Sequence, residues 1–173
     1  HQSVEHIPSL RIIPGVDVWR PADGLETVVA RASALERKDA PSVLCLSRQN
    51  LPRLADAGMV AAIRRGGYVL AEGTNPQAII LATGSETSLA MAAHAALAAE
   101  GISTRVVSMP CTSAFDRQDK AYQDSVLPAN LTAVAIEAAQ PDFWHKYVGR
   151  GAIIGMRTFG ESAPAKDLYA HFN

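Results

Sequence analysis

Short apolar runs that alternate with helical patterns dominate the second half of the chain. The runs lie at residues 78–82, 104–109, 131–137 and 152–156. Strands of a parallel sheet are buried on both faces and read as nearly continuous apolar runs, and strands separated by helices are typical of α/β folds. The sequence therefore predicts a doubly wound, mostly parallel α/β sheet over residues 67–173, with a last helix that begins near Ser162-Ala163-Pro164.

The first half predicts a shorter unit of strand, helix and strand. Residues 10–13 have strand composition and stop at a Pro-Gly turn, and residues 42–46 form an apolar run typical of a buried parallel strand. Between them, Asp23 and Glu26 have the spacing of a capping box at the start of a helix. The expected apolar face of that helix comprises Leu25, Val28, Val29, Ala32 and Leu35.

Residues 52–66 interrupt the alternation of strands and helices. The segment begins with Pro52 and ends at a run of two arginines and two glycines, so it predicts a connection with a short helix at most. We therefore expect a partial α/β domain over residues 1–51, a linker over 52–66 and a second domain over 67–173.

Composition excludes several classes of function. The 16 basic and 17 acidic residues leave a net charge of −1, which favours neither nucleic acid nor an anionic membrane as a partner. Cys45 and Cys111 are isolated in the sequence, which is typical of reduced thiols in a cytoplasmic protein and does not indicate a zinc site. No apolar run approaches the roughly 20 residues of a bilayer span, and the start lacks a signal-peptide pattern, so neither membrane insertion nor secretion is expected.

Arg48 is the most informative polar residue, because Ser47-Arg48-Gln49-Asn50 closes the expected strand at 42–46. Ligands of open parallel sheets bind at strand ends, and the planar guanidinium suits a phosphate dianion. The alternative is a surface arginine paired with a carboxylate. His1 could hydrogen-bond a sugar hydroxyl or act near neutral pH as an acid or base, or it could be an ordinary loop or tag residue.

Two further segments allow a functional and a structural interpretation. Thr83-Gly84-Ser85 lies between a strand and a helix and could cradle an anion, but a single glycine fits a plain turn better. Glu137 ends a strand and is followed by Trp144, His145 and Tyr147, which could line a pocket, although aromatic packing at a domain edge explains them more simply.

Seven segments together resemble the C-terminal part of a transketolase. They occur in family order from the first residue almost to the last. The segments are His1 to His6, Trp19-Arg20-Pro21-Ala22-Asp23, Leu46 to Pro52, Gly66-Gly67-Tyr68-Val69-Leu70, Ala82-Thr83-Gly84-Ser85-Glu86, Arg105 to Pro110, and Phe159-Gly160-Glu161-Ser162-Ala163-Pro164. Such an ordered set is far more specific than any one of its members.

The resemblance implies a homodimeric, three-domain enzyme of which this chain is a fragment. Residues 1–51 would be the end of the pyrimidine-binding domain, and residues 67–173 would be the C-terminal domain. The family binds thiamine diphosphate through a divalent metal, Mg or Ca. Its Gly-Asp-Gly motif and the glutamate that activates the cofactor are missing from this sequence, so we expect no catalytic, cofactor or metal ligand here.

The activity implied by the resemblance is transfer of a two-carbon ketol unit from a ketose phosphate to an aldose phosphate, as in the pentose phosphate pathway and the Calvin cycle. Arg48 matches the family's arginine that holds the substrate phosphate. His1 matches the histidine that hydrogen-bonds the donor sugar, although the threonine that precedes it in the family is missing. The fragment alone would be inactive.

Two other functions remain open at this point. One is a related thiamine-dependent ketol transferase such as a dihydroxyacetone synthase, whose distinguishing motifs would lie outside this sequence. The other is a non-catalytic module for dimerisation or regulation, formed by residues 67–173.

Overall fold

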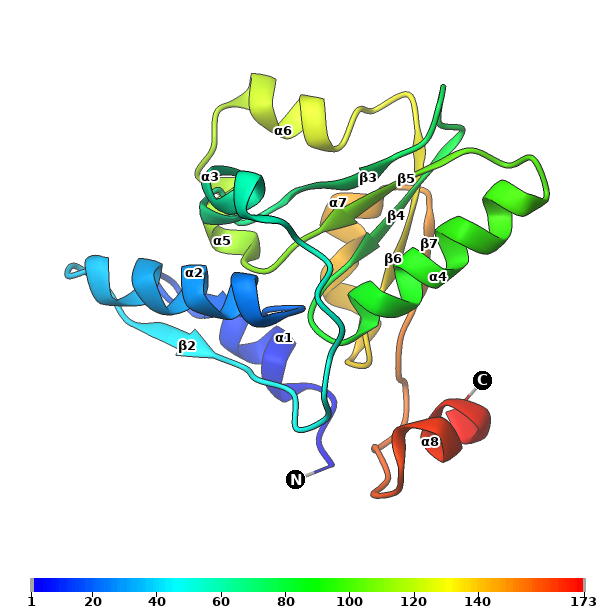
Figure 1. Cartoon of the computed structure of the whole chain (residues 1–173). Helices are drawn as coiled ribbons and strands as arrows, with labels where there is room; N and C mark the ends of the chain where they lie inside the picture. Colours follow the sequence, from blue (N-terminus) through cyan, green and yellow to red (C-terminus); the bar gives the residue numbers. More distant parts are fainter. Residues whose placement is uncertain (1, 173) are drawn as a thin grey trace.

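The computed structural model describes residues 2–172, which form two α/β units joined by a connection (Figure 1). The second unit contains a five-stranded sheet. Its strands are β3 (Tyr68–Glu72), β4 (Ala78–Ala82), β5 (Thr104–Ser108), β6 (Thr132–Ile136) and β7 (Ala152–Ile154), in the spatial order β3-β5-β4-β6-β7. The last four are parallel and β3 is antiparallel to β5. The predicted α/β class with a mostly parallel sheet is confirmed, while β3 was not among the predicted strands.

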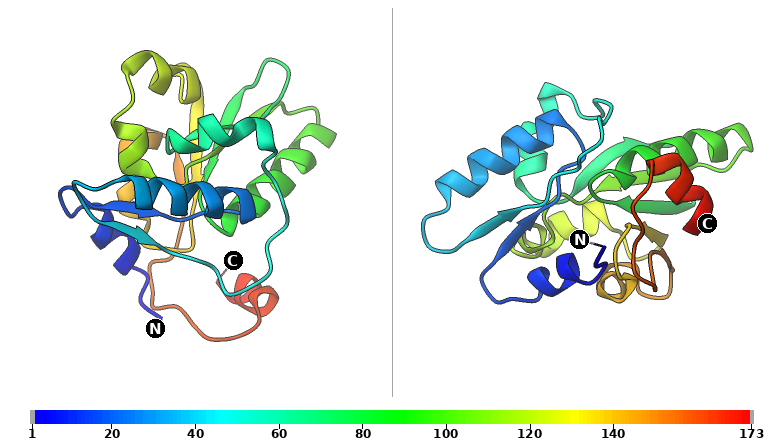
Figure 2. Two further views of the ribbon diagram at one scale, coloured as in Figure 1. Left: turned by 60° about the vertical axis from the view of Figure 1, so that its left-hand side comes forward. Right: turned by 90° about the horizontal axis from the view of Figure 1, so that it is seen from below.

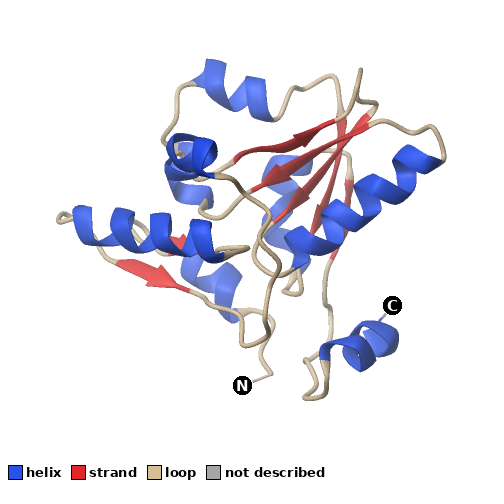
Figure 3. Ribbon diagram, in the orientation of Figure 1, coloured by secondary structure: helices blue, strands red, loops and turns tan. Residues whose placement is uncertain are grey.

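Alternate residues of the central strands enter two separate cores, as expected of a doubly wound sheet. Ile80 and Val106 pack on the face covered by α4 (Glu86–Ala99), whereas Leu81 and Val107 pack on the opposite face. The second face is covered by α5 (Thr112–Asp116), α6 (Lys120–Val126), η2 (Pro141–Trp144) and α7 (His145–Val148). Figure 3 shows helices on both sides of the strands.

The first unit consists of α1 (His6–Arg11), β1 (Asp17–Trp19), α2 (Gly24–Glu36) and β2 (Ser42–Leu44), with β1 parallel to β2. The strand predicted at 10–13 is wrong, because this stretch ends a helix and enters a turn. Ile12 and Ile13, whose branched side chains suggested a strand, are 73% and 46% exposed. The strand at 42–46 is confirmed in part: β2 is shorter and only half-buried, since β1 is its single neighbour among the described strands.

The buried side of α2 includes a polar residue that the apolar pattern does not reveal. In α2 the buried residues are Glu26, Val29 and Ala30, whereas Val28 and Leu35 are exposed. The predicted apolar face of α2 is therefore confirmed in part, because Val29 is buried and Leu25 packs against the same core. Glu26 also points into the protein and takes a buried position that the apolar pattern did not predict.

Asp23 fixes both the start of α2 and the path of the connection. One carboxylate oxygen accepts the Glu26 N–H at 2.9 Å, and the other accepts the N–H groups of Leu54 and Ala55, both at 2.9 Å. The predicted cap is confirmed, but the Glu26 carboxylate accepts the N–H of Ala22 rather than that of Asp23. A single carboxylate thus anchors a helix and a distant segment of chain.

The connection contains the short helices η1 (Ala57–Met59) and α3 (Val60–Arg64), in agreement with the expected short helix. Ala55 and Ile63 are buried in the same core as Val29 and Tyr68. After β7 the chain runs to α8 (Ala165–Phe172), which lies below the sheet and its covering helices in Figure 1 and near the lower edge of the left-hand view of Figure 2. The predicted last helix is therefore confirmed, and it has no buried residue among those described.

We expect Asp23→Ala to lower the free energy of unfolding by about 2–4 kcal/mol, because it removes a helix cap and two further bonds to a charged acceptor. Urea unfolding measures this. Asp23→Asn should lose less, since it keeps one oxygen but turns an amide toward two N–H donors. Asp56→Ala, which removes the exposed cap of η1, is the matched control and should cost about 1 kcal/mol or less. Equal losses at positions 23 and 56 would contradict the anchoring role.

Candidate functional site

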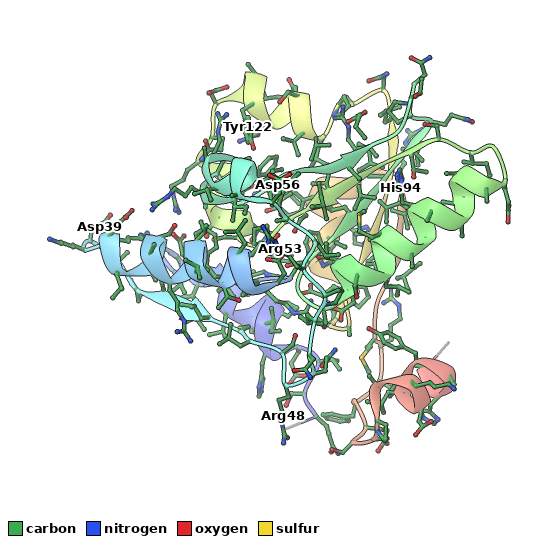
Figure 4. All side chains as sticks on the ribbon, viewed as in Figure 1. Asp39, Arg48, Arg53, Asp56, His94 and Tyr122 are labelled. Carbon is green, nitrogen blue, oxygen red and sulfur yellow. The ribbon has the colours of Figure 1, made fainter. Side chains whose placement is uncertain are left out.

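Arg48 lies in the exposed loop that follows β2, and its side chain points away from the body of the protein (Figure 4). Within residues 2–172 its side chain has no hydrogen bond or ion pair. The alternative in which Arg48 pairs with a carboxylate is therefore not realised among these residues. Within this part of the chain, its guanidinium is therefore available to bind a ligand.

The edge of the first unit that carries Arg48 is formed by the carboxyl ends of two parallel strands. The Cys45 N–H donates to the Trp19 carbonyl oxygen at 2.8 Å, which extends the pairing of β1 and β2 by one bond. The chain after β1 continues into Arg20 and the chain after β2 continues into Arg48. Both arginines thus follow strand ends, but they have opposite environments.

His1 lies outside the described residues, so the structure does not test its proposed contact with the sugar. The residues that follow it are placed against the second unit. The Gln2 carbonyl accepts the Gly160 N–H at 2.8 Å, and the Val4 carbonyl accepts the Gln140 N–H at 2.9 Å.

Arg20 is buried at the contact between the two units. Its Nη1 lies 2.6 Å from Glu86 Oε2 and 3.6 Å from Glu137 Oε1, and it donates to the Thr83 carbonyl at 2.7 Å. Its Nη2 is 3.5 Å from Ser85 Oγ. The guanidinium therefore occupies the turn after β4. The Gly84 N–H donates to the Arg20 carbonyl at 3.0 Å, and these contacts favour the plain-turn interpretation of Thr83-Gly84-Ser85 over an anion cradle.

A second arginine completes this buried cluster. Arg11, at the end of α1, donates from both Nη atoms to the two oxygens of Glu137, at 2.7 and 2.9 Å. The indole N–H of Trp144 donates to the same carboxylate at 2.7 Å. Burial raises the pKa of the Glu137 carboxyl, but Arg11, Arg20 and Trp144 outweigh burial and hold that pKa below its usual range.

The aromatic residues after Glu137 have different surroundings. Trp144 is fully buried and lies edge-on to Phe143, in agreement with the packing interpretation. Tyr147 donates to the Asp116 carboxylate at 3.1 Å and lines a small open pocket, and His145 is exposed. Packing is therefore confirmed for Trp144, whereas Tyr147 lies at a pocket as the alternative interpretation allowed.

Glu26 is a second buried carboxyl, and its pKa is shifted in the opposite direction to that of Glu137. Its Oε1 accepts the hydroxyls of Tyr68 and Ser108 at 2.8 and 2.6 Å, and no cation pairs with it among the described residues. Burial raises the pKa of Glu26 above its usual range, and these hydrogen bonds offset only part of the effect. Glu26 also joins the units, since Tyr68 begins β3 and Ser108 ends β5.

The described residues contain no group of three or more His, Cys, Asp or Glu side chains that could hold a metal ion. Cys45 and Cys111 are both free thiols. No helix in residues 2–172 has the length and apolar character needed to cross a membrane.

Sequence reasoning assigned no role to Arg20, Glu86 or Arg11. Arg20 and Glu86 stand within two of the segments that carry the family resemblance. Neither of them directly follows a predicted strand, and the members of the cluster are far apart in sequence, so no local pattern could pair them.

Two family models match the chain. The model described as "Transketolase-like TK C-terminal domain" matches residues 66–173, and the model described as "Transketolase, pyrimidine binding domain" matches residues 1–53. Among curated proteins, Transketolase 1 of Vibrio vulnificus is 56% identical over 178 aligned positions, and Transketolase 1 of Escherichia coli is 53% identical over 176. Each comparison covers 99% of this chain and 26% of the relative, so the chain spans about a quarter of the length of these proteins.

Solved structures show the same likeness. A transketolase from Leishmania mexicana is 44% identical with a TM-score of 0.92, and a Pichia stipitis transketolase in complex with sedoheptulose-7-phosphate is 38% identical with a TM-score of 0.93. Each covers 99% of this chain, which corresponds to 25% of the solved chain.

Replacement of Glu26 should change how stability depends on pH. A carboxyl whose pKa is higher in the folded protein than in the unfolded chain makes the protein less stable as pH rises from about 4.3, the unfolded value, through the folded value. Glu26→Gln removes this loss, because an amide can accept from the Ala22 N–H and donate to the two hydroxyls. We expect its unfolding free energy to be flatter with pH and at least equal to the original protein at pH 7.

Glu26→Ala is the matched variant for this experiment. It leaves two hydroxyls and one N–H without their acceptor and should lower the unfolding free energy by about 2–4 kcal/mol. Urea unfolding between pH 4 and pH 8 measures all three proteins. Identical pH slopes for the original protein and Glu26→Gln would contradict the raised pKa.

Proposed function

Because the chain belongs to the transketolase family, we propose that it forms part of an enzyme that transfers a two-carbon ketol unit from a ketose phosphate to an aldose phosphate. The observation that connects this proposal to a particular residue is Arg48, which is exposed at the carboxyl ends of β1 and β2 and has no partner within residues 2–172. We propose the division of the chain into a pyrimidine-binding remnant (1–51), a linker (52–66) and a C-terminal domain (67–173).

We assign Arg48 to the substrate phosphate and His1 to a hydroxyl near the reacting end of the donor sugar. A guanidinium can bind a phosphate through two parallel hydrogen bonds, and a charge-assisted contact of this kind contributes about 1.5–3 kcal/mol in total. A sugar phosphate therefore gains affinity at Arg48 that its unphosphorylated analogue lacks. The Pichia stipitis relative solved with sedoheptulose-7-phosphate supports this class of substrate.

The family's thiamine diphosphate supplies the electron sink for ketol transfer. The described residues of this chain offer no cluster of metal ligands, and we assign no cofactor contact to them. We propose instead that the diphosphate and its Mg or Ca ion are held by the rest of the complete enzyme. Assembly as a homodimer and a cytoplasmic location are further proposals, and the chain alone should be inactive.

The test is Arg48→Ala in the complete enzyme. We expect the KM for phosphorylated substrates to rise about 10- to 100-fold, because the substrate phosphate loses its charged partner. The KM for unphosphorylated ketols should change little. Steady-state kinetics with both substrate types measure the difference.

Arg31→Ala is the matched control for this experiment, since Arg31 is exposed on α2, and its KM values should not change. An equal effect of Arg48→Ala on both substrate types would refute the phosphate role.

A further inference from the structure

The strand order of the second unit marks the place at which α/β sheets bind their ligands. β4 lies between β5 and β6, and the chain leaves β4 through α4 on one face but reaches β6 from the other face. Ligands of doubly wound sheets bind outside the carboxyl ends of two such neighbouring strands. In this protein that place, called the crevice below, lies between the ends of β4 and β6, beside Glu86 and Glu137, and the side chains of Arg20 and Arg11 fill it.

Every group of the second unit that contacts Arg20 in this crevice can accept a hydrogen bond. The carboxylates of Glu86 and Glu137 are 3% and 2% exposed. The Thr83 carbonyl and the Ser85 hydroxyl complete the set around the bound Arg20 side chain. A ring of acceptors with two buried negative charges matches the donor fork of a guanidinium and repels an anion.

The backbone of the turn also fits a flat cation. Gly84 has a φ of +58°, and a Cβ at this position would lie 2.7 Å from Arg20 Cζ. The Glu86 carboxylate lies in the first turn of α4 and accepts the Ala138 N–H at 3.0 Å. The positive end of α4, which often attracts phosphates in such sheets, therefore already has an anion of the protein beside it.

We propose that this crevice is a guanidinium-binding site. Glu86 and Glu137 bind the arginines of the first unit there, so the second unit recognises the first through the crevice that related sheets use for small ligands. Arg20 occupies the part beside β4, and Arg11 occupies the part beside β6, between Glu137 and the rings of Phe143 and Trp144. This site is separate from the proposed phosphate contact at Arg48.

Rescue by free guanidinium tests the proposal. Arg20→Ala in the full chain leaves two buried carboxylates with an empty space that opens to solvent, since the Arg20 side chain is 10% exposed. We expect its Tm to fall, and tens of millimolar guanidinium chloride to raise it again in a saturable manner by about 2–6 °C relative to equal NaCl. The same additions should leave the Tm of the original protein unchanged or lower it slightly.

Three controls define the site. Arg64→Ala removes an arginine from an exposed pair with Glu36, and guanidinium should not raise its Tm. Arg20→Ala combined with Glu86→Gln should lose the rescue, and inorganic phosphate should give Arg20→Ala no rise. A rise with phosphate equal to that with guanidinium would overturn the proposal.

If Arg20→Ala gives no cooperative transition in either salt, Arg11→Ala provides the second test. In the original protein the Arg11 side chain donates two hydrogen bonds to Glu137. Guanidinium should therefore raise the Tm of Arg11→Ala in the same way. Absence of a rise specific to guanidinium in both variants would refute the site.

Discussion

Two buried carboxylates of the second unit are neutralised only by arginines of the first unit among the described residues, and the arrangement of the protein depends on this contact. Removal of one partner from a buried ion pair costs about 3–5 kcal/mol, because the remaining charge stays in a poorly solvated place. Glu86 and Glu137 would face that penalty if residues 67–173 stood alone, unless they became protonated or the crevice took up water. The same contact therefore argues against an independent module made of the second unit, and for two units that are stable as one body.

Much of the second unit could be predicted from sequence, because its central strands are buried on both faces. Residues 78–82 and 104–109 are rich in apolar side chains, and in an α/β chain runs of this length and composition are typical of buried strands. β3 (Tyr68–Glu72) lies at the edge, with a half-exposed pattern, and gave no comparable signal. The false strand at 10–13 has a different cause. Arg11, the last residue of α1, forms an ion pair with Glu137, and this tertiary contact stabilises a helix end where local composition suggests a strand.

In the candidate site, too, some residues could be predicted from sequence and others could not. The position of Arg48 could be predicted from sequence, since a cation after an apolar strand has a predictable place at the sheet edge. The cluster of Arg11, Arg20, Glu86 and Glu137 could not, because each member looks like an ordinary surface charge until the fold brings it to its partner. Glu26 shows the same limit: it shares the buried side of α2 with Val29 and Ala30, and no periodicity of apolar residues can reveal a buried carboxyl.

Arg20 and Arg48 follow neighbouring parallel strands, yet only one of them has a charge available for a ligand. Arg20 has its hydrogen-bonding capacity used by Glu86, Thr83 and Ser85, so it contributes to the assembly of the units. The contact also fills the edge at which the second sheet could otherwise bind a small molecule. The proposed recognition of the substrate phosphate is then assigned to the carboxyl edge of the first unit, where Arg48 is exposed and unpaired among the described residues. Since an anion gains most from a cation that has no other partner, this division of roles favours Arg48 over Arg20 as the phosphate ligand.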